Sequence, residues 1–156
     1  MSSDEPVGQD RPDANDSTAK ATFRLLNNTD EMARLDRAVD EFGQAEQWPE
    51  QMSYHIKLAL EEVVMNVINY AYDDDDDHEF EVRVESNREH VVIDIIDDGQ
   101  PFDPLQEAAT PDVEASLEAR SIGGLGVFFV KTLMDEVEYR RENDCNRLTL
   151  TKRYQE

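Results

Sequence analysis

The chain has 156 residues, of which 38% are hydrophobic and 33% charged, and its formal net charge is −22. This length suits one domain with a packed core and is too short for two. The acidity disfavours binding to nucleic acid or to anionic membranes, and it fits either a basic protein partner or a charged coat that keeps the protein soluble in a high-salt cytoplasm.

The N-terminal residues 1–20 are polar and rich in Asp, Ser and Pro, which predicts a disordered acidic tail before one domain spanning 21–156. They lack the apolar core of a signal peptide, and no apolar run approaches the roughly 18 residues of a membrane span. The single cysteine, Cys145, excludes an internal disulfide framework. These features together predict a cytoplasmic protein that spans no membrane.

The hydrophobic patterns predict, in chain order, a strand, two helices, two strands, a long connection, a helix and two strands. The expected bounds are 21–26, 28–43, 50–72, 79–86, 90–97, 124–136, 136–141 and 147–153. Glu31 stands three residues after Asn28 and suggests a capping box at the first helix. Because hairpins replace βαβ units, we expect an α+β, two-layer sandwich with helices on one face of a mixed, mainly antiparallel sheet.

Two segments between these elements are candidates for a special role. The acidic run 73–77 lacks the glycine and the spaced ligands of an EF-hand, so we interpret it as a solvated loop. The connection between Gly99 and Gly123 contains three prolines and only one short helical pattern, near Val113–Leu117. Connections of this length are typical of functional lids or of disordered insertions.

The stretch LEEVVMNVINYAY (60–72) places Glu62, Asn66 and Asn69 on one face of an otherwise apolar helix. Buried polar groups are costly without partners, so either the fold or a ligand must satisfy them. An amide oxygen can ligate a divalent cation while a carboxylate one turn away activates a nucleophile. The alternative is a helix face that neighbouring groups satisfy.

Two further motifs follow this helix. IIDDGQPFDP (95–104) ends a strand with Asp97 at the rim of the sheet, where it could accept from an exocyclic amine, although Asp and Gly are also common turn residues. SIGGLGVFFV (121–130) leads glycines into a helix, whose exposed N–H groups suit phosphates. It matches neither a Walker A loop nor a dinucleotide fingerprint.

Taken together and in this order, these motifs resemble the Bergerat-fold ATPases, the family of gyrase B, heat-shock chaperones and histidine kinases. LALEEVVMNVINYAY, IIDDGQPFDP and GGLGVFFVKTLMDEV are most similar to the anti-sigma factor serine/threonine kinases. The resemblance covers roughly residues 21–153 and implies the histidine-kinase-like ATPase fold.

The resemblance also implies roles for individual residues. Glu62 is expected as the general base that polarises a serine hydroxyl or an attacking water, and Asn66 as the ligand of a Mg²⁺ ion that bridges the ATP phosphates. Asp97 is expected to accept from the adenine amine, and Gly99 to give the ring room. The residues expected near the phosphates are Arg120, Gly124 and Gly126.

By the same resemblance, the protein uses ATP to phosphorylate a serine of an anti-anti-sigma protein and so controls a sigma factor. A homodimer through the first strand and first helix is implied as well. The alternatives are a non-catalytic, nucleotide-dependent binding module of this fold and an interaction domain that has lost nucleotide binding.

Two positions depart from the family pattern. Pro101 replaces the second glycine of the Asp-x-Gly-x-Gly box, and Cys145-Asn146 replaces a common Gly-Thr pair, so that Asn146 is expected to substitute for a threonine contact to the nucleotide. The arginines and lysine of the last two strands are interpreted as charge on a strand face rather than as a site.

Overall fold

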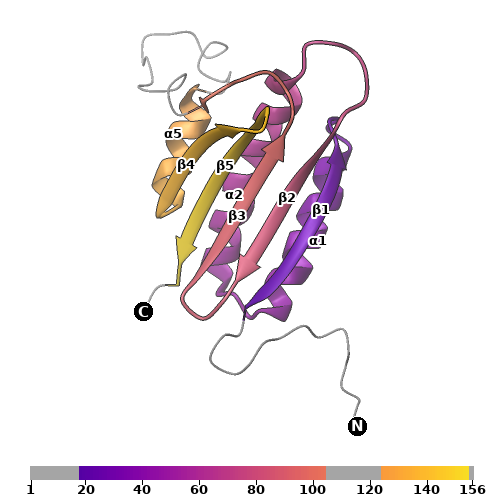
Figure 1. Ribbon diagram of the computed structural model, residues 1–156. Coiled ribbons are helices and arrows are strands. Elements are labelled where there is room, and N and C mark those ends of the chain that lie inside the picture. The colour runs from indigo at the N-terminus through magenta and orange to yellow at the C-terminus, as the bar shows by residue number, and fades with distance from the viewer. Residues whose placement is uncertain (1–17, 105–123, 155–156) are drawn as a thin grey trace.

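The computed structural model describes residues 18–104 and 124–154 (Figure 1). Their secondary structure follows the expected order. The elements are β1 (Ala19–Leu26), α1 (Glu31–Ala45), α2 (Glu50–Asn66), η1 (Val67–Ala71), β2 (Glu79–Ser86), β3 (His90–Asp97), α5 (Gly124–Leu133), β4 (Glu136–Glu142) and β5 (Cys145–Arg153).

The strands form one five-stranded sheet in the order β1-β2-β3-β5-β4, and every pair of neighbours is antiparallel. Helices α1, α2 and α5 lie together on one face of this sheet (Figure 1). This confirms the two-layer α+β fold. The sheet is antiparallel throughout the described residues rather than mixed: β2–β3 and β4–β5 are hairpins, and the β1–β2 and β3–β5 pairs, joined by longer connections, are antiparallel as well.

The core lies between the sheet and the helices and follows from the period of two along each strand. In β3, Val91, Ile93 and Ile95 are buried in alternation with half-buried residues. From α2, Ile56 and Val64 reach the same core. The alternation continues to the end of β3, so the last residue of that strand also faces the helices.

Several boundaries differ from the expected ones. β1 begins at Ala19, so residues 19 and 20 belong to the sheet and not to the tail. α1 begins at Glu31 rather than at Asn28, and the expected capping box is not formed. Instead, the Asn28 side chain accepts from the Asp30 N–H at 3.0 Å, and the Glu31 carboxylate accepts from the Leu26 N–H at 2.9 Å.

The second helix changes type before it ends. It is α-helical to Asn66 and then widens into the π-helical turn η1, Val67–Ala71. Short π segments inside α-helices are frequent at functional sites. Here the backbone after β3 docks onto this turn, since the Gln100 N–H donates to the Ala71 carbonyl at 2.8 Å.

The β4–β5 turn is tighter than the sequence suggested. Asn143 and Asp144 have φ of 55° and 62°, and a two-residue turn of this kind joins strands that run on to Glu142 and from Cys145. α5 ends at Leu133, three residues before the expected end. None of the described helices is long and apolar enough to cross a membrane.

Some expectations lie outside the described residues. These are the disorder of residues 1–17, the lid and its short helical pattern near Val113–Leu117, and the position of Arg120.

Candidate functional site

The candidate site begins at Asp97, the last residue of β3, whose side chain is only 5% exposed. One carboxylate oxygen, Oδ1, accepts from the Gly99 N–H and from the Asn146 side-chain amide, both at 2.9 Å. Within the described part of the chain, no group donates to the other oxygen, Oδ2. Asp97 therefore has one oxygen occupied by the protein and one free to accept from a ligand.

The electrostatics of Asp97 reflect this mixed environment. Burial raises the pKa of its carboxyl above the ordinary value, and the nearby charge of Asp98 adds to that shift. The hydrogen bonds from Asn146 and Gly99 lower the pKa, as does the positive charge of Arg141. The donors thus offset part of the cost of keeping a buried carboxylate charged.

A small cavity of about 30 Å³ lies beside Asp97, and Asn66 from α2 also lines it. Most of its wall is apolar, and the full set of lining residues is Val63, Asn66, Val67, Ala71, Ile95, Asp97, Phe102, Pro104, Tyr139, Asn146 and Leu148. A cavity of this volume has room for about one water molecule. A purine ring would therefore have to displace part of the wall on entry.

Asn66 is 7% exposed, and no residue of the described ranges forms a hydrogen bond with its side-chain amide. Its polar atoms are not among the solvent-inaccessible, unpartnered atoms of the described residues, so the amide keeps some solvent access beside the cavity. Among the described residues there is no group of three or more His, Cys, Asp or Glu that could hold a metal ion by itself. A cation held by Asn66 would take one protein ligand here and the rest of its shell from phosphates and water, so this role stays a prediction.

Glu62 lies one helical turn before Asn66 and is half-buried. Burial is the main cause that raises the pKa of its carboxyl, and the charge of Glu61 raises it further. A raised pKa brings a carboxylate closer to the range useful for a general base. Glu61 is exposed and lines a hollow between α1 and α2, so of the two residues Glu62 remains the better candidate. Asn69 is exposed and does not line the cavity.

Gly99 is required by backbone packing. A Cβ placed on it would lie 2.2 Å from the Ala71 carbonyl oxygen and 2.7 Å from the Ala71 carbonyl carbon. Gln100 strengthens this contact, because its side chain donates to the Tyr70 carbonyl at 2.8 Å. The turn after β3 therefore packs directly against the backbone of the π-helical turn η1. Room for an adenine ring at Gly99 stays a prediction.

Asn146 was expected to contact a nucleotide directly, and the structure gives it other partners. Its amide nitrogen donates to Asp97 and to the Gln100 carbonyl at 2.9 and 2.8 Å. Its amide oxygen accepts from the Tyr139 hydroxyl at 2.6 Å and from the Phe102 N–H at 3.3 Å. The contacts of Tyr139 and Phe102 with Asn146 were not predicted. They depend on how β3, β5 and β4 pair, which the local sequence does not show.

The glycines that were expected to hold phosphates begin α5. Gly124 is its first residue and Gly126 its third. α5 starts at the end of the sheet where β3 terminates, so the positive end of its helix dipole lies toward the Asp97 end of the molecule (Figure 1). Arg120, the third residue expected near phosphates, lies outside the described residues.

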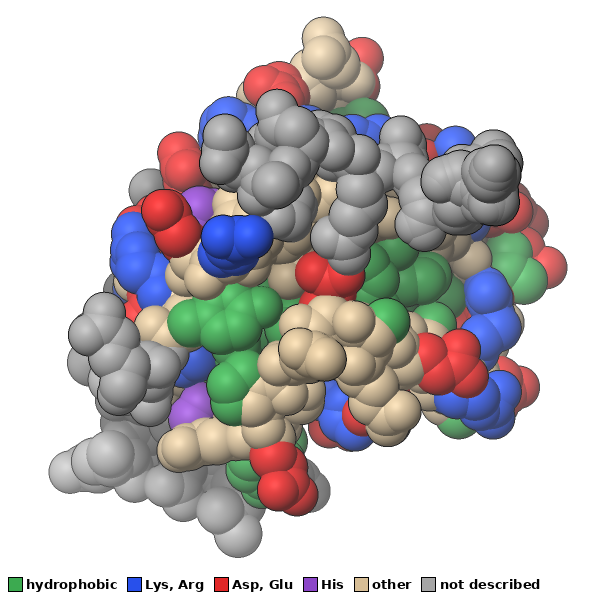
Figure 2. Space-filling view, turned by 90° about the horizontal axis from the view of Figure 1, so that it is seen from below, with side chains coloured by type: hydrophobic (Ala, Val, Ile, Leu, Met, Phe, Trp, Pro, Cys, Tyr) green, Lys and Arg blue, Asp and Glu red, His purple; other side chains and the backbone are tan. Residues whose placement is uncertain are grey.

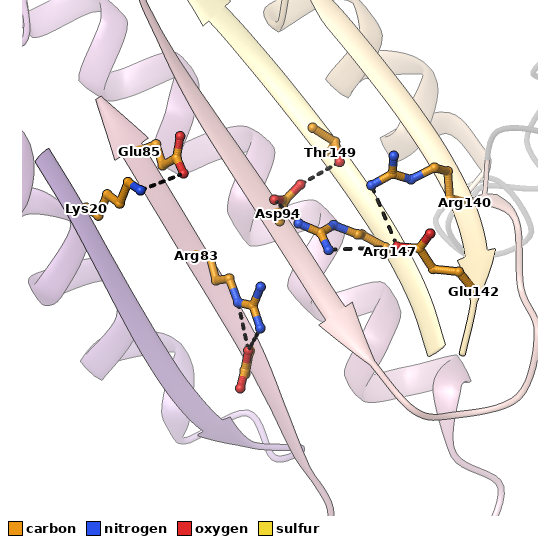
Figure 3. A network of polar contacts seen from close by, with 9 residues as sticks. Lys20, Arg83, Glu85, Asp94, Arg140, Glu142, Arg147 and Thr149 are labelled. Carbon is orange, nitrogen blue, oxygen red and sulfur yellow. Dashed lines mark hydrogen bonds and ion pairs between the residues drawn. The ribbon is translucent and has the colours of Figure 1, made fainter. Parts of the chain in front are cut away.

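The open face of the sheet carries a different polar network (Figure 3). Arg147 on β5 contacts Asp94 on β3 at 2.7 Å, and the Thr149 hydroxyl donates to the same carboxylate at 2.5 Å. Arg140 and Arg153 are likewise within ion-pair distance of acids, so for these arginines the interpretation as strand-face charge agrees with their contacts. At the end of the molecule away from Asp97, seen from below the view of Figure 1, acidic and basic side chains are scattered around apolar patches (Figure 2).

Two of the basic residues do not belong to that open face. Arg141 donates to the Gly99 carbonyl at 2.8 Å and thus contacts the turn that follows Asp97. Lys152 is buried and donates to the Leu133 carbonyl at 2.7 Å, at the C-terminal end of α5. For Arg141 and Lys152 the interpretation as strand-face charge was wrong, because both point to the helical side.

The chain matches one protein family and is similar to several known proteins. Residues 25–152 match the family described as "Histidine kinase-like ATPase domain". The serine/threonine-protein kinase BtrW of Bordetella bronchiseptica is 26% identical over 106 residues, which are 68% of this chain and 74% of that protein. The serine-protein kinase RsbW of Oceanobacillus iheyensis is 31% identical over 90 residues, 56% of this chain and 57% of that protein.

RsbW of Listeria monocytogenes is 33% identical over 86 residues, 53% of this chain and 55% of that protein, so the matched region spans little more than half the length of the RsbW relatives. Among solved structures, a crystal structure of the RsbU and RsbW domains of a Mycobacterium tuberculosis protein superposes with a TM-score of 0.59. That match has 16% identity and covers 88% of this chain and 33% of that one, so it supports the fold alone.

Proposed function

Because this chain belongs to the histidine kinase-like ATPase domain family, we propose that it binds ATP with Mg²⁺ beside Asp97 and transfers the γ-phosphoryl group to a serine of a partner protein. One observation carries the proposal. Asp97 and Asn66 come from different elements, line the same cavity, and each keeps a polar group without a partner among the described residues.

Asp97 supplies recognition of the base. Its Oδ2 accepts from the exocyclic amine of adenine, while the apolar wall of Val67, Ile95 and Leu148 covers the ring. An acceptor buried among apolar groups discriminates strongly, because a ligand without a matching donor leaves it unpaired.

Asn66 would hold the cation through its amide oxygen. When bound, magnesium neutralises charge on the phosphates during transfer. The N–H groups at the start of α5, from Gly124 to Gly126, and the charge of Arg120 are proposed to bind the phosphates themselves. This local site is needed because the net charge of −22 repels a free nucleotide.

Glu62 is proposed as the general base. It accepts the proton of the serine hydroxyl as the serine oxygen bonds to the γ-phosphorus and the bond from that phosphorus to the bridging oxygen breaks, which releases ADP. Its half-buried position and raised pKa support this role, since a base of very low pKa transfers protons poorly at neutral pH.

The partner is proposed from the relatives that are named serine-protein kinases. We propose an anti-anti-sigma protein as the phosphorylated partner and a sigma factor as the partner that the kinase holds. A homodimer through β1 and α1 and a cytoplasmic location belong to the same proposal.

The first experiment measures the thermal shift and the calorimetric binding of Mg-ATP and Mg-ADP to the full chain. A ligand at a hundredfold excess over its Kd stabilises the fold by about 2.7 kcal/mol. We expect a magnesium-dependent shift that is lost in Asn66→Ala. The absence of any shift with either nucleotide in the wild type would reject the ATP site and leave an interaction domain.

The second experiment separates catalysis from binding. Glu62→Gln keeps the shape of the side chain and removes the base, so we expect nucleotide affinity within about twofold of the wild type and phosphate transfer at least about a hundredfold slower. The assay follows phosphate from ATP to the serine of the cognate antagonist. Equal transfer by the variant would disprove the base role, and no transfer by the wild type would favour the non-catalytic binding module.

A further inference from the structure

The amide of Asn146 has every hydrogen-bonding position used. Its nitrogen donates to the Asp97 carboxylate and the Gln100 carbonyl, and its oxygen accepts from Tyr139 and from the Phe102 backbone. Both acceptors lie on the nitrogen side and both donors on the oxygen side. A flipped amide would set oxygen against oxygen at Asp97 and Gln100, so this network allows one orientation.

The sheet register brings these groups together. Asn146 pairs with Asp97 across β3–β5 and with Arg141 across β4–β5, so it lies between two strand ends. Its side chain points to the helical face and is only 6% exposed. Buried polar networks of this kind are rigid when every member is satisfied.

Because Asn146 has no unused hydrogen-bonding group in this arrangement, it acts on a ligand through Asp97. Together with the Gly99 N–H, it occupies Oδ1 of that carboxylate and leaves Oδ2 without a donor among the described residues, on a side chain that lines the cavity. The same two donors lower the pKa of Asp97 against the effect of burial and so favour the charged form. A charged carboxylate can only accept, whereas a protonated one can also donate.

Resting on the ATP site proposed above, we propose that Asn146 is a positioning residue that holds Asp97 as an acceptor, so that the site selects 6-aminopurine over 6-oxopurine nucleotides. Adenine presents an amine at C6, which donates to Oδ2. Hypoxanthine presents a carbonyl oxygen at the same place, which faces that carboxylate oxygen acceptor to acceptor. ATP and ITP differ at C6 and in the proton that hypoxanthine carries on N1, and they are the probes.

The test compares the Kd of Mg-ATP and Mg-ITP for the full chain by calorimetry. In the wild type we expect ITP to bind at least about tenfold more weakly than ATP. In Asn146→Leu, which keeps the shape and removes the amide, Asp97 is freed to rotate and its pKa rises. We expect the ratio of the two Kd values to fall to about twofold.

A pH series supplies a readout that a merely structural role would not change. In Asn146→Leu the preference for ATP should return as the pH rises and Asp97 ionises, while in the wild type the full preference should already be reached at a lower pH, because Asn146 lowers the pKa of Asp97. The other charged and titratable groups that face Asp97 are Asp98, Arg141, Tyr72 and Tyr139. All four are unchanged in the variant.

Two further variants guard against a folding defect. Tyr139→Phe removes one hydrogen bond to Asn146 and is expected to give an intermediate ratio. Thr149→Val removes a hydrogen bond to Asp94 on the other face of the sheet and should leave the ratio unchanged. A tenfold or larger preference for ATP that persists in both Asn146→Leu and Tyr139→Phe would overturn the inference. Failure of the wild type to bind Mg-ATP would overturn the proposed function and this inference with it.

Discussion

Two carboxylates on β3, three residues apart, illustrate how one kind of contact serves different ends. Asp94 and Asp97 each receive a hydrogen bond from a β5 side chain. Asp94 lies on the open face, where Arg147 neutralises it at 2.7 Å (Figure 3). Asp97 lies on the helical face, where its partner on β5 is the neutral amide of Asn146 and no cationic side chain forms an ion pair with it among the described residues.

The difference teaches where a ligand can bind. On the open face a full ion pair satisfies the carboxylate, and a partly exposed pair of this kind contributes little stability. On the helical face burial raises the pKa of Asp97. The groups that donate hydrogen bonds to it, the Asn146 amide and the Gly99 N–H, are neutral and offset only part of that shift. The unsatisfied oxygen of Asp97 is therefore available to a ligand, and the oxygens of Asp94 are not.

The difference between the two carboxylates is tested most directly by comparing Asp97→Asn with Asp94→Asn. With its oxygen held by Gly99 and Asn146, an amide at position 97 turns a donor toward the cavity. We expect ATP to bind about 100-fold more weakly, equivalent to about 2.7 kcal/mol, and ITP to lose much less. In Asp94→Asn the affinity for ATP should stay within about twofold of the wild type. Equal losses in the two variants would show that the faces do not differ in this way.

Gly99→Ala tests the packing beneath the same strand end. The added methyl group would lie 2.2 Å from the Ala71 carbonyl oxygen, so the turn after β3 and the π-helical turn must separate. We expect the free energy of unfolding to fall by about 1–3 kcal/mol in urea denaturation. Gln100→Ala removes a hydrogen bond without adding an atom and should cost less. A fully stable Gly99→Ala would mean that this contact yields easily.

The dependence of the free energy of unfolding on pH tests the buried state of Asp97. Burial raises the folded pKa of Asp97 above the ordinary value of an unfolded Asp. Its contribution to stability is therefore present below the unfolded pKa and is lost as the pH rises through the folded pKa. We therefore expect the wild type to lose stability relative to Asp97→Asn over that interval. Urea denaturation across a pH series measures this difference, and a difference of opposite sign would contradict the buried state of the carboxylate.

Arg147→Leu is expected to have the smallest effect. The arginine is partly exposed, its Nε is buried without a partner among the described residues, and its ion pair with Asp94 lies on the open face. We expect a change of less than about 1 kcal/mol in the free energy of unfolding, decreasing further in high salt. ATP affinity should not change. A loss of several kcal/mol would show that the open-face network is structural in its own right.

Much of the fold was readable from local pattern. Alternation along 79–86 and 90–97 predicted β2 and β3 with their observed bounds, because a half-buried strand repeats every two residues. The spacing of Glu62 and Asn66 predicted a shared helix face, and the glycines predicted the start of α5. Their roles toward ATP remain predictions made by resemblance; within the described part of the chain, only Asn66 of these residues lines the cavity beside Asp97.

Other features could not be read from local pattern. The π-helical turn at Val67–Ala71 continues a pattern that looks α-helical, and in the fold its last carbonyl accepts from the Gln100 N–H. Arg141 and Lys152 seemed to share the strand-face charge of their neighbours. Their side chains instead reach the Gly99 carbonyl and the end of α5, because strand alternation places them on the helical side.

The sequence by itself determined the element order, the α+β class and the order of the site motifs, since each depends on residues close together in the chain. The hydrogen bond from Asn146 to Asp97 and the packing of Gly99 against the Ala71 carbonyl depend on the tertiary structure. Asp97 and Asn146 are 49 positions apart, and the contact arises only when β3 and β5 pair in this register. A hydrogen bond between residues so distant depends on where the sheet brings them, and neither residue carries a local signal of its partner.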